Sequence, residues 1–170
     1  ALRHAEKVLT VSEFSKAEII RLYHVASEKI VVTPNAVEVP IRSMLIQPEM
    51  RELLARYGIS RRYFLFVGRV ESKKNISGLL EAFRLFKEKS GVVHDVQLVL
   101  AGKPGHGHDD IIRRLRASVF KNDVVELGYV PQEDVGALYA GAEAFVFPSL
   151  YEGFGLPVLE AFAAQVPVIA

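Results

Sequence analysis

The stretch Tyr63–Lys89, YFLFVGRVESKKNISGLLEAFRLFKEK, contains one complete strand–loop–helix unit. Its first five residues, Tyr63–Val67, form an unbroken apolar and aromatic run, which is typical of a strand buried on both faces of a sheet. In the segment Asn75–Glu88, apolar residues recur at helical spacing, which gives a helix one apolar face. The residues of that face are Leu79, Leu80, Phe83 and Phe86. The unit therefore predicts a strand followed by a helix that covers the sheet.

The same alternation of apolar runs and amphipathic segments extends over the rest of the chain. The runs that we expect to form strands are Val8–Val11, Ile30–Thr33, Tyr63–Val67, Val96–Ala101, Val124–Leu127, Ala144–Phe147 and Val166–Ala170. The segments that we expect to form helices are Ser12 or Ser15 to Tyr23, Pro48–Tyr57, Asn75–Glu88, Asp109–Phe120, Gln132–Ala142 and Gly155–Gln165. The sequence thus predicts an α/β fold with a Rossmann-like parallel sheet covered by helices.

The segment Pro40–Pro48 is the best candidate for a domain boundary, since it reads as a loop. We expect residues 1–40 to form a crossover that includes the end of a neighbouring lobe, and residues 41–170 to form the compact domain. The last predicted strand ends at Ala170 with nothing after it. We therefore expect the domain to be incomplete at its C-terminus.

Composition excludes several classes of function. The 170 residues, 50% apolar and 24% charged, suffice for one globular domain. A net charge of +1 argues against nucleic-acid binding through a basic face. The absence of cysteine excludes disulfide bonds and thiolate metal sites. The longest run without a charged residue, Ala161–Ala170, is about half as long as a membrane-spanning helix must be.

The loop after the strand Tyr63–Val67 combines a glycine with basic residues. Gly68 lets a ligand approach the backbone, while Arg69 and Lys74 can neutralise a diphosphate. Arginine is suited to a bidentate contact and lysine acts as a point charge. The alternative is a solvated loop whose charges bind nothing, and this loop alone does not decide between the two.

The loop after the sixth predicted strand leads into the last predicted helix. Gly153 and Gly155 expose the backbone where that helix begins, and Pro157 suits its first turn, so free N–H groups there can bind an anion. Glu152 and Glu160 would repel a phosphate, but they can accept hydrogen bonds from sugar and ribose hydroxyls on either side of it. The alternative is that both glutamates are ordinary surface charges.

Two other loops carry weaker signals. After the strand Val124–Leu127, a small residue and exposed backbone at Gly128, Tyr129 and Val130 could accommodate a flat base. Before the fourth predicted helix stand His106, His108, Asp109 and Asp110. Their spacing could chelate a metal ion, but the segment is typical of an exposed loop in which Asp109 serves as a helix N-cap. We therefore expect no metal site.

These features follow one another in a defined order along the chain. The order is Gly68-Arg69 with Lys74-Asn75, Ala101-Gly102, Gly128, and then Glu152 and Glu160 separated by seven residues, within Pro-Ser, Glu-Gly-Phe-Gly and Glu-Ala. In order and spacing they resemble glycosyltransferase family 4, over nearly the whole chain. The residues Thr10, Ser12, Ser15 and Pro34-Asn35 resemble the family's passage between two domains.

Two positions depart from the family pattern. Ala36 and Gln165 stand where family members usually have glycine. A left-handed cap at Gln165 would cost on the order of 1 kcal/mol, so we expect that turn to be reshaped.

The resemblance implies a GT-B enzyme, in which two Rossmann-like domains face each other and this chain is the donor-binding half. It implies a retaining transferase that uses a nucleoside-diphosphate sugar and no metal or other cofactor. Arg69 and Lys74 would bind the diphosphate, Glu160 the ribose hydroxyls and Glu152 the transferred sugar. The full set expected to bind the donor is Gly68, Arg69, Lys74, Gly128, Tyr129, Val130, Glu152, Gly153, Phe154, Gly155, Leu156 and Glu160, with Arg69, Lys74 and Glu152 also acting in catalysis.

The donor, partners and location follow from the same resemblance. The context of Glu152 looks like that of mannosyltransferases that build surface polysaccharide, so GDP-mannose is the favoured donor, with UDP- or ADP-sugars as alternatives. An N-terminal acceptor domain, a cytoplasmic location and association of the parent enzyme with the inner face of the membrane are expected. A non-catalytic nucleotide-sugar-binding or regulatory module is a further alternative. A dinucleotide-binding domain is disfavoured because no G-x-G-x-x-G follows the early strands.

Overall fold

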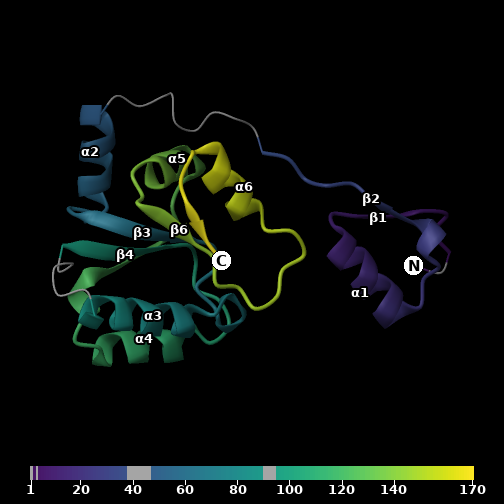
Figure 1. Ribbon diagram of the computed structural model, residues 1–170, viewed down its shortest axis with the longest axis horizontal. Helices are drawn as coiled ribbons and strands as arrows, with labels where there is room; N and C mark the ends of the chain where they lie inside the picture. Colours follow the sequence, from purple (N-terminus) through teal and green to yellow (C-terminus); the bar gives the residue numbers. More distant parts are fainter. Residues whose placement is uncertain (1, 3, 38–46, 90–94) are drawn as a thin grey trace.

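The computed structural model describes residues 2, 4–37, 47–89 and 95–170. Five parallel strands form a sheet in the order β5-β4-β3-β6-β7, and helices lie on both of its faces (Figure 1). The strands are β3 (Arg62–Val67), β4 (Val96–Ala101), β5 (Val124–Gly128), β6 (Ala144–Val146) and β7 (Val168–Ile169). The helices are α2 (Gln47–Arg56), α3 (Ile76–Lys89), α4 (His108–Ala117), α5 (Gln132–Ala140) and α6 (Leu156–Ala163). The predicted α/β fold with a parallel sheet is confirmed.

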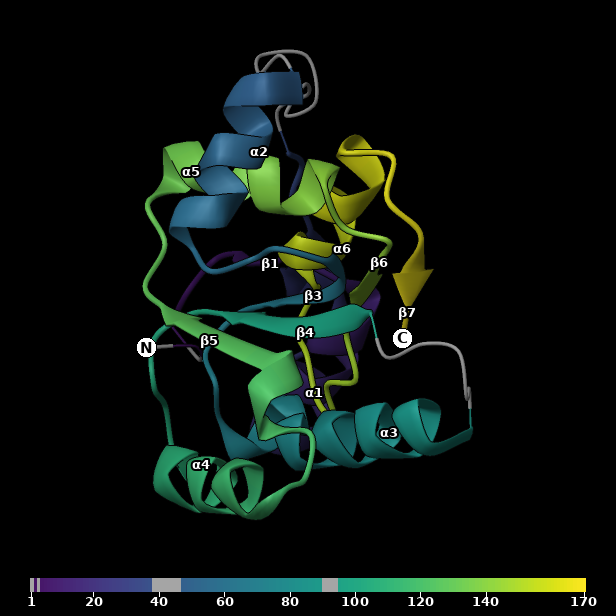
Figure 2. The ribbon, with the colours of Figure 1, turned by 90° about the vertical axis from the view of Figure 1, so that its left-hand side faces the viewer.

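Each face of the sheet has its own hydrophobic core. Helices α3 and α4 cover one face, and α2, α5 and α6 cover the other (Figure 2). Successive side chains of a strand point to opposite faces, so Leu65 packs in the core beneath α5 and α6, while Phe66 packs in the core beneath α3. Neither side chain is accessible to solvent. Burial on both faces is the physical reason why the central strand β3 is an unbroken apolar run from Tyr63 to Val67.

The strand order brings two distant loops together. Strand β3 pairs with β4 on one side and with β6 on the other, with Leu65 opposite Phe145. The chain therefore reverses its direction of winding between β3 and β6. In open parallel sheets, ligands bind at such a switch point, beyond the carboxyl ends of the strands. The loops that follow β3 and β6 are the two that carry Arg69, Lys74 and Glu152.

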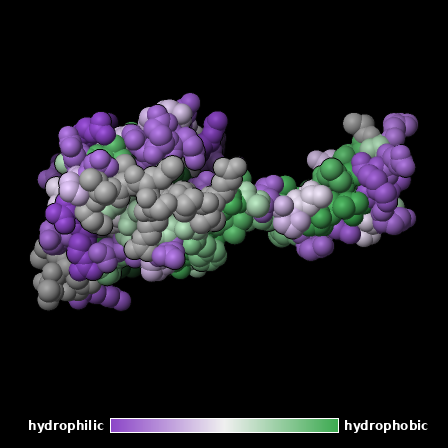
Figure 3. All heavy atoms as spheres, turned by 90° about the horizontal axis from the view of Figure 1, so that it is seen from above, coloured by the Kyte–Doolittle hydropathy of each residue, from purple (hydrophilic) through white to green (hydrophobic). Residues whose placement is uncertain are grey.

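An N-terminal unit projects from one side of the five-stranded domain (Figures 1 and 3). It consists of β1 (Val8–Thr10), α1 (Glu13–Tyr23) and β2 (Ile30–Val32), and its two strands pair in parallel. Val8, Val25 and Ile30 form a small core of its own. Several large apolar side chains of the unit are exposed, namely Leu9, Phe14, Leu22, Tyr23 and Val31. The expected boundary lies largely outside the described residues, since residues 38–46 are not described, and the division near residue 40 stays a prediction.

Local details correct two expectations. Helix α4 begins at His108 with Gly107, at φ +79°, as its cap residue, so Asp109 is not the N-cap that its side chain suggested. Gln165 adopts a left-handed φ of +58°, so the turn after α6 is not reshaped. Its strain is compensated by backbone hydrogen bonds that close the turn, from Gln165 N to Phe162 O and from Val166 N to Ala161 O.

The edge of the sheet differs from the expected buried strand at the C-terminus. Strand β7 is limited to Val168–Ile169 and, among the described residues, pairs with β6 alone; Ile169 is 53% exposed. Across the described residues, no helix is both long enough and apolar enough to cross a membrane.

Candidate active site

The loops after β3 and β6 meet through an ion pair. Lys74, at the end of the short 3-10 helix Ser72–Lys74, donates a hydrogen bond to Glu152 Oε1. The backbone supports this contact, since Leu150 N donates to Lys73 O at 3.1 Å. The Nζ atom of Lys74 also lies 5.7 Å from the ring centroid of Phe147, within range of a cation–π contact. The structure thus joins the predicted diphosphate-binding lysine to the predicted sugar-binding glutamate.

Arg69 differs from Lys74 in having no internal acceptor. Its side chain is exposed, and it forms no ion pair or side-chain hydrogen bond with any of the described residues. A guanidinium in this state can bind an incoming anion without first breaking another contact. Of the two cations predicted to bind the diphosphate, Arg69 is therefore unpaired among the described residues and Lys74 is paired.

Backbone hydrogen bonds connect the carboxyl ends of β3, β4 and β5, where the three loops begin. Gly68 N donates to Ala101 O at 2.9 Å, and Gly102 N donates to Gly128 O at 2.7 Å. A Cβ atom on Gly102 would lie 1.9 Å from the carbonyl oxygen of Gly68, so only glycine allows this approach. The carboxyl ends of these strands are therefore connected through backbone atoms, and the connections use no side chain that could contact a ligand.

At the carboxyl end of β5, an aromatic ring and a cation are stacked. Tyr129 is 64% exposed, and Lys103 Nζ lies 4.6 Å from its ring centroid. Lys103 was not among the residues predicted from the sequence, although it directly follows the Ala101-Gly102 signal. The side chain of Val130 is buried in the core, so any contact of this residue with a ligand would come from its backbone.

Glu160, on helix α6, is held by a residue that the sequence analysis missed. The buried phenol of Tyr139, on α5, donates a hydrogen bond to Glu160 Oε2 at 2.9 Å and lies 3.3 Å from Pro157 O. Burial, with the adjacent Glu160 charge, raises the pKa of Tyr139, so the phenol stays protonated and remains a donor. The only sequence signal was a hydroxyl-bearing aromatic residue in the apolar second half of the helix.

An aromatic stack connects the supports of the two glutamates. The ring of Tyr139 meets Phe145 edge to face at 5.4 Å, and Phe145 stacks on Phe147 at 5.8 Å. Phe147 is the ring that lies beside Lys74. The buried rings therefore run from the partner of Glu160 to the partner of Glu152.

The glycine-rich loop ends where α6 begins. Gly155 is the cap residue, with φ +93°, and Leu156 and Pro157 form the first turn, as expected for the helix start. Leu156 is partly exposed and Phe154 is half-buried. The carbonyl of Gly153 points toward α1 of the N-terminal unit, where it accepts hydrogen bonds from two serines.

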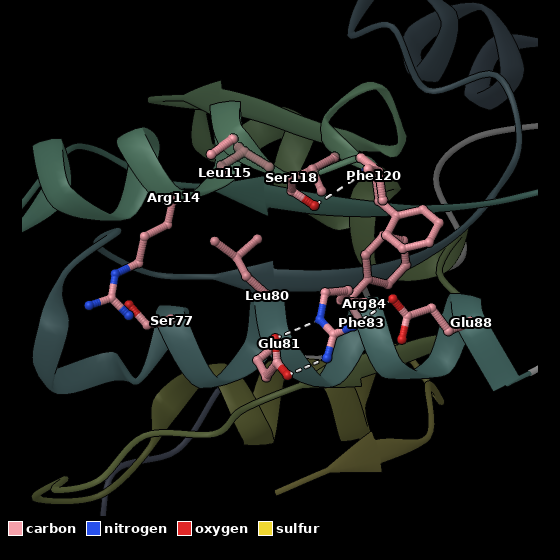
Figure 4. Close-up of a pocket in the computed structure, with 13 residues that line it drawn as sticks. Ser77, Leu80, Glu81, Phe83, Arg84, Glu88, Arg114, Leu115, Ser118 and Phe120 are labelled. Atoms are coloured by element: carbon pink, nitrogen blue, oxygen red, sulfur yellow. Dashed lines mark hydrogen bonds and ion pairs between the residues drawn. The ribbon is translucent and has the colours of Figure 1, made fainter.

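Two other features do not belong to this site. His108 Nε2 lies 2.5 Å from Glu126 Oε1, and within the described part of the chain no three His, Cys, Asp or Glu side chains are placed to hold a metal ion. A groove of about 680 Å³ lies between α3 and α4, and Figure 4 shows Leu80 and Phe83 beside the ion pairs of Arg84. None of the predicted donor-binding residues lines it.

Comparison with known proteins matches the sequence of this chain to one family. Residues 49–170 match the family model described as Glycosyl transferases group 1. The chain is 39% identical to O-antigen chain mannosyltransferase B of Escherichia coli over 173 aligned positions, covering 99% of the chain and 44% of that protein. It is 30% identical to O-antigen chain mannosyltransferase RfbU of Salmonella typhimurium, covering 99% of the chain and 43% of that protein.

A solved structure shows the same fold. HepE of Anabaena, crystallised with UDP and glucose, superimposes with a TM-score of 0.83 at 22% identity, covering all of this chain and 45% of HepE. The chain therefore spans less than half the length of each of these relatives.

Proposed function

The chain belongs to the group 1 glycosyl transferases, and we propose that it forms the donor-binding half of a retaining hexosyltransferase. The enzyme transfers a hexose from a nucleoside-diphosphate sugar to a glycan or lipid-linked acceptor. The observation that carries this proposal is the ion pair between Lys74 and Glu152 at the switch point of the sheet. Glu160 lies on α6, the helix that follows the loop of Glu152. Cations and hydroxyl acceptors are thus available side by side, as a sugar diphosphate requires.

In the proposed reaction, the bond between the anomeric carbon and the diphosphate oxygen breaks, and negative charge builds up on the leaving phosphate. Arg69 and Lys74 neutralise that charge, which lowers the barrier without a bound metal ion. The acceptor hydroxyl oxygen forms the new bond to the anomeric carbon, and its proton passes to the leaving diphosphate. Glu152 gives up its ion pair with Lys74 and accepts a hydrogen bond from a hydroxyl of the transferred sugar. Glu160 accepts hydrogen bonds from the ribose hydroxyls.

GDP-mannose is the proposed donor, and a UDP-sugar is second. Mannose is supported by the names of the two O-antigen relatives, while the HepE crystals contain UDP. The exposed ring of Tyr129, with Lys103 over it, is the candidate contact for the base. We further propose that the parent enzyme acts in polysaccharide biosynthesis on the cytoplasmic side of the membrane.

The test is a calorimetric panel of GDP, UDP and ADP, each alone and as its hexose conjugate, titrated into the 170-residue chain. We expect GDP and GDP-mannose to bind most tightly. Tighter binding of UDP and its conjugates would change the donor and leave the enzyme class intact. Failure of every nucleoside diphosphate to bind would contradict the proposed function.

The same chain should bind the donor without transferring the sugar. It contributes the phosphate-binding cations from one side, whereas transfer also requires a positioned acceptor and exclusion of water. Transfer is measured by the release of nucleoside diphosphate in the presence of an acceptor glycan. Robust transfer by the chain alone would show that it is wrong to assign only donor binding to this chain.

A further inference from the structure

Helix α1 contacts the loop that carries Glu152 at Gly153, the residue that follows Glu152. The hydroxyls of Ser12 and Ser15 lie 2.5 and 3.2 Å from the carbonyl oxygen of Gly153, which has two lone pairs and can accept from both. Ser12 is also the N-cap of α1, since its Oγ accepts from Ser15 N at 3.0 Å. A Cβ atom on residue 153 would lie 3.2 Å from Ser15 Oγ, so glycine is what allows α1 to approach this closely.

Helix α1 also binds the residue before Glu152. The phenol of Tyr151 donates to Glu18 Oε2 at 2.6 Å, and its ring meets Phe14 edge to face at 5.2 Å. Hydrogen bonds from Arg21, and then from Tyr151, lower the pKa of Glu18 to about 2. Glu18 is therefore a carboxylate at neutral pH and remains an acceptor for Tyr151.

These contacts place Glu152 between two anchored neighbours. Tyr151 and Gly153 are bound to α1, while the side chain of Glu152 reaches Lys74 on the loop after β3. The N-terminal unit that contributes α1 has its own sheet and core, so the anchor comes from outside the domain that carries the predicted donor residues.

We propose that Ser12, Ser15 and Glu18 are positioning residues, which hold Glu152 where it meets the transferred sugar. This inference rests on the proposed function, because the ligand of Glu152 is assigned there. Ordering one backbone residue costs about 1–2 kcal/mol, and a loop that is ordered before binding avoids that cost when the ligand arrives. The sugar should benefit most, because the diphosphate is bound mainly by Arg69 and Lys74.

The experiment removes the anchors without removing Glu152. Ser12→Gly with Ser15→Ala deletes both hydroxyls, and glycine costs a helix N-cap only a few tenths of a kcal/mol. Tyr151→Phe deletes the other hydrogen bond and keeps the ring on Phe14. The control is Ser27→Ala, at an exposed position of the same unit. Each variant is titrated with GDP and GDP-mannose, and with UDP and UDP-glucose, after its melting temperature has been measured.

The readout is the affinity for the sugar conjugate divided by the affinity for the bare diphosphate. We expect the double serine variant to lower this ratio roughly three- to tenfold, the effect of about one hydrogen bond, and Tyr151→Phe to lower it less. The control should leave it unchanged. In a Glu152→Gln background the serine changes should have no further effect on the ratio, since they act through Glu152.

The outcomes separate this inference from the proposed function. If Glu152→Gln lowers the ratio and neither anchor variant does, the positioning role is overturned and the proposed function stands. If the anchor variants lower the ratio equally with or without Glu152, the role is also overturned, because the effect does not pass through that residue. If Glu152→Gln leaves the ratio unchanged, the sugar role of Glu152 is wrong and the inference is overturned with it, while nucleoside-diphosphate binding stands. If no nucleoside diphosphate binds, the proposed function itself is overturned.

Discussion

The two glutamates of the candidate site are held in different ways. Glu160 lies on helix α6 and accepts a hydrogen bond from Tyr139, whose ring is fully buried in the core. Glu152 lies in a loop, pairs with a lysine and is flanked by residues that α1 anchors. The first carboxylate is oriented by packing that is present whether or not a ligand is bound. The second is engaged with Lys74, a cation that the ligand itself would need.

The two glutamates therefore differ in what a ligand has to displace before it can bind. A ligand hydroxyl can meet Glu160 without displacing a cation, whereas a diphosphate has to draw Lys74 away from Glu152. Arg69, which has no such partner among the described residues, is the natural first contact for the anion. The variants below test the comparison.

Removing a cation should have the largest effect. Arg69→Ala or Lys74→Ala should weaken every nucleoside diphosphate by about 1.5–3 kcal/mol, typical of charge-assisted hydrogen bonds. Lys74→Ala should cost more than Arg69→Ala, because it also leaves Glu152 unpaired beside the phosphates. Calorimetry measures both, and adding Glu152→Gln to Lys74→Ala should recover part of the loss. Equal effects in single and double variants would mean that the pair is unimportant for binding.

Changes at Glu160 should come next and should depend on the ribose. Glu160→Gln weakens the acceptor, so the preference for a ribonucleotide over its 2′,3′-dideoxy analogue should fall by about 1 kcal/mol. Tyr139→Phe should reduce the same preference by a smaller amount, because it frees the carboxylate to rotate. The two changes together should be less than additive. A Tyr139→Phe variant with a lowered melting temperature and an unaltered ribose preference would restrict Tyr139 to a role in stability.

Glu152→Gln should produce a smaller effect, which should differ between the two ligands. Bare diphosphate should bind equally well or better, by at most about 1 kcal/mol, since Lys74 no longer has to leave an ion pair. The sugar conjugate should bind worse relative to the diphosphate, because the glutamine is a weaker acceptor for sugar hydroxyls. Paired titrations of GDP and GDP-mannose give the ratio. An equal change for both ligands would show that the sugar role of Glu152 is wrong.

Removal of metal ions should have no effect. The candidate site offers cations and a helix start, and the described residues contain no cluster of three metal-ligating side chains. Titrations of diphosphate in EDTA and in Mn²⁺ should therefore give the same affinity. Binding that EDTA abolishes and Mn²⁺ restores would show that a metal ion neutralises the diphosphate instead of Arg69 and Lys74.

The sequence by itself determined the layers of the fold and the positions of the charged loops. Continuous apolar runs such as Tyr63–Val67 predict strands that are covered on both faces, and local spacing predicts the helices between them. Local propensity was less reliable at helix ends, as Asp109 shows, because Gly107, in a left-handed conformation two residues earlier, caps α4 instead. Gly68, Arg69, Lys74, Glu152 and Glu160 were singled out by residue type and spacing together with the family resemblance, and their roles as donor contacts stay predictions.

Only the tertiary structure decided which of these residues meet. The pairing of β3 with β6 joins loops that are 78 positions apart at Lys74 and Glu152, and no local pattern encodes that order of strands. The supports of the site were equally invisible in the sequence. In the sequence, Tyr139 is typical of a core residue of α5, and Ser12 and Ser15 indicate a helix start and resemble the family's interdomain passage. Only the fold places a carboxylate beside the first and a carbonyl beside the others. Contacts of this kind depend on long-range packing, which residue spacing along the chain does not specify.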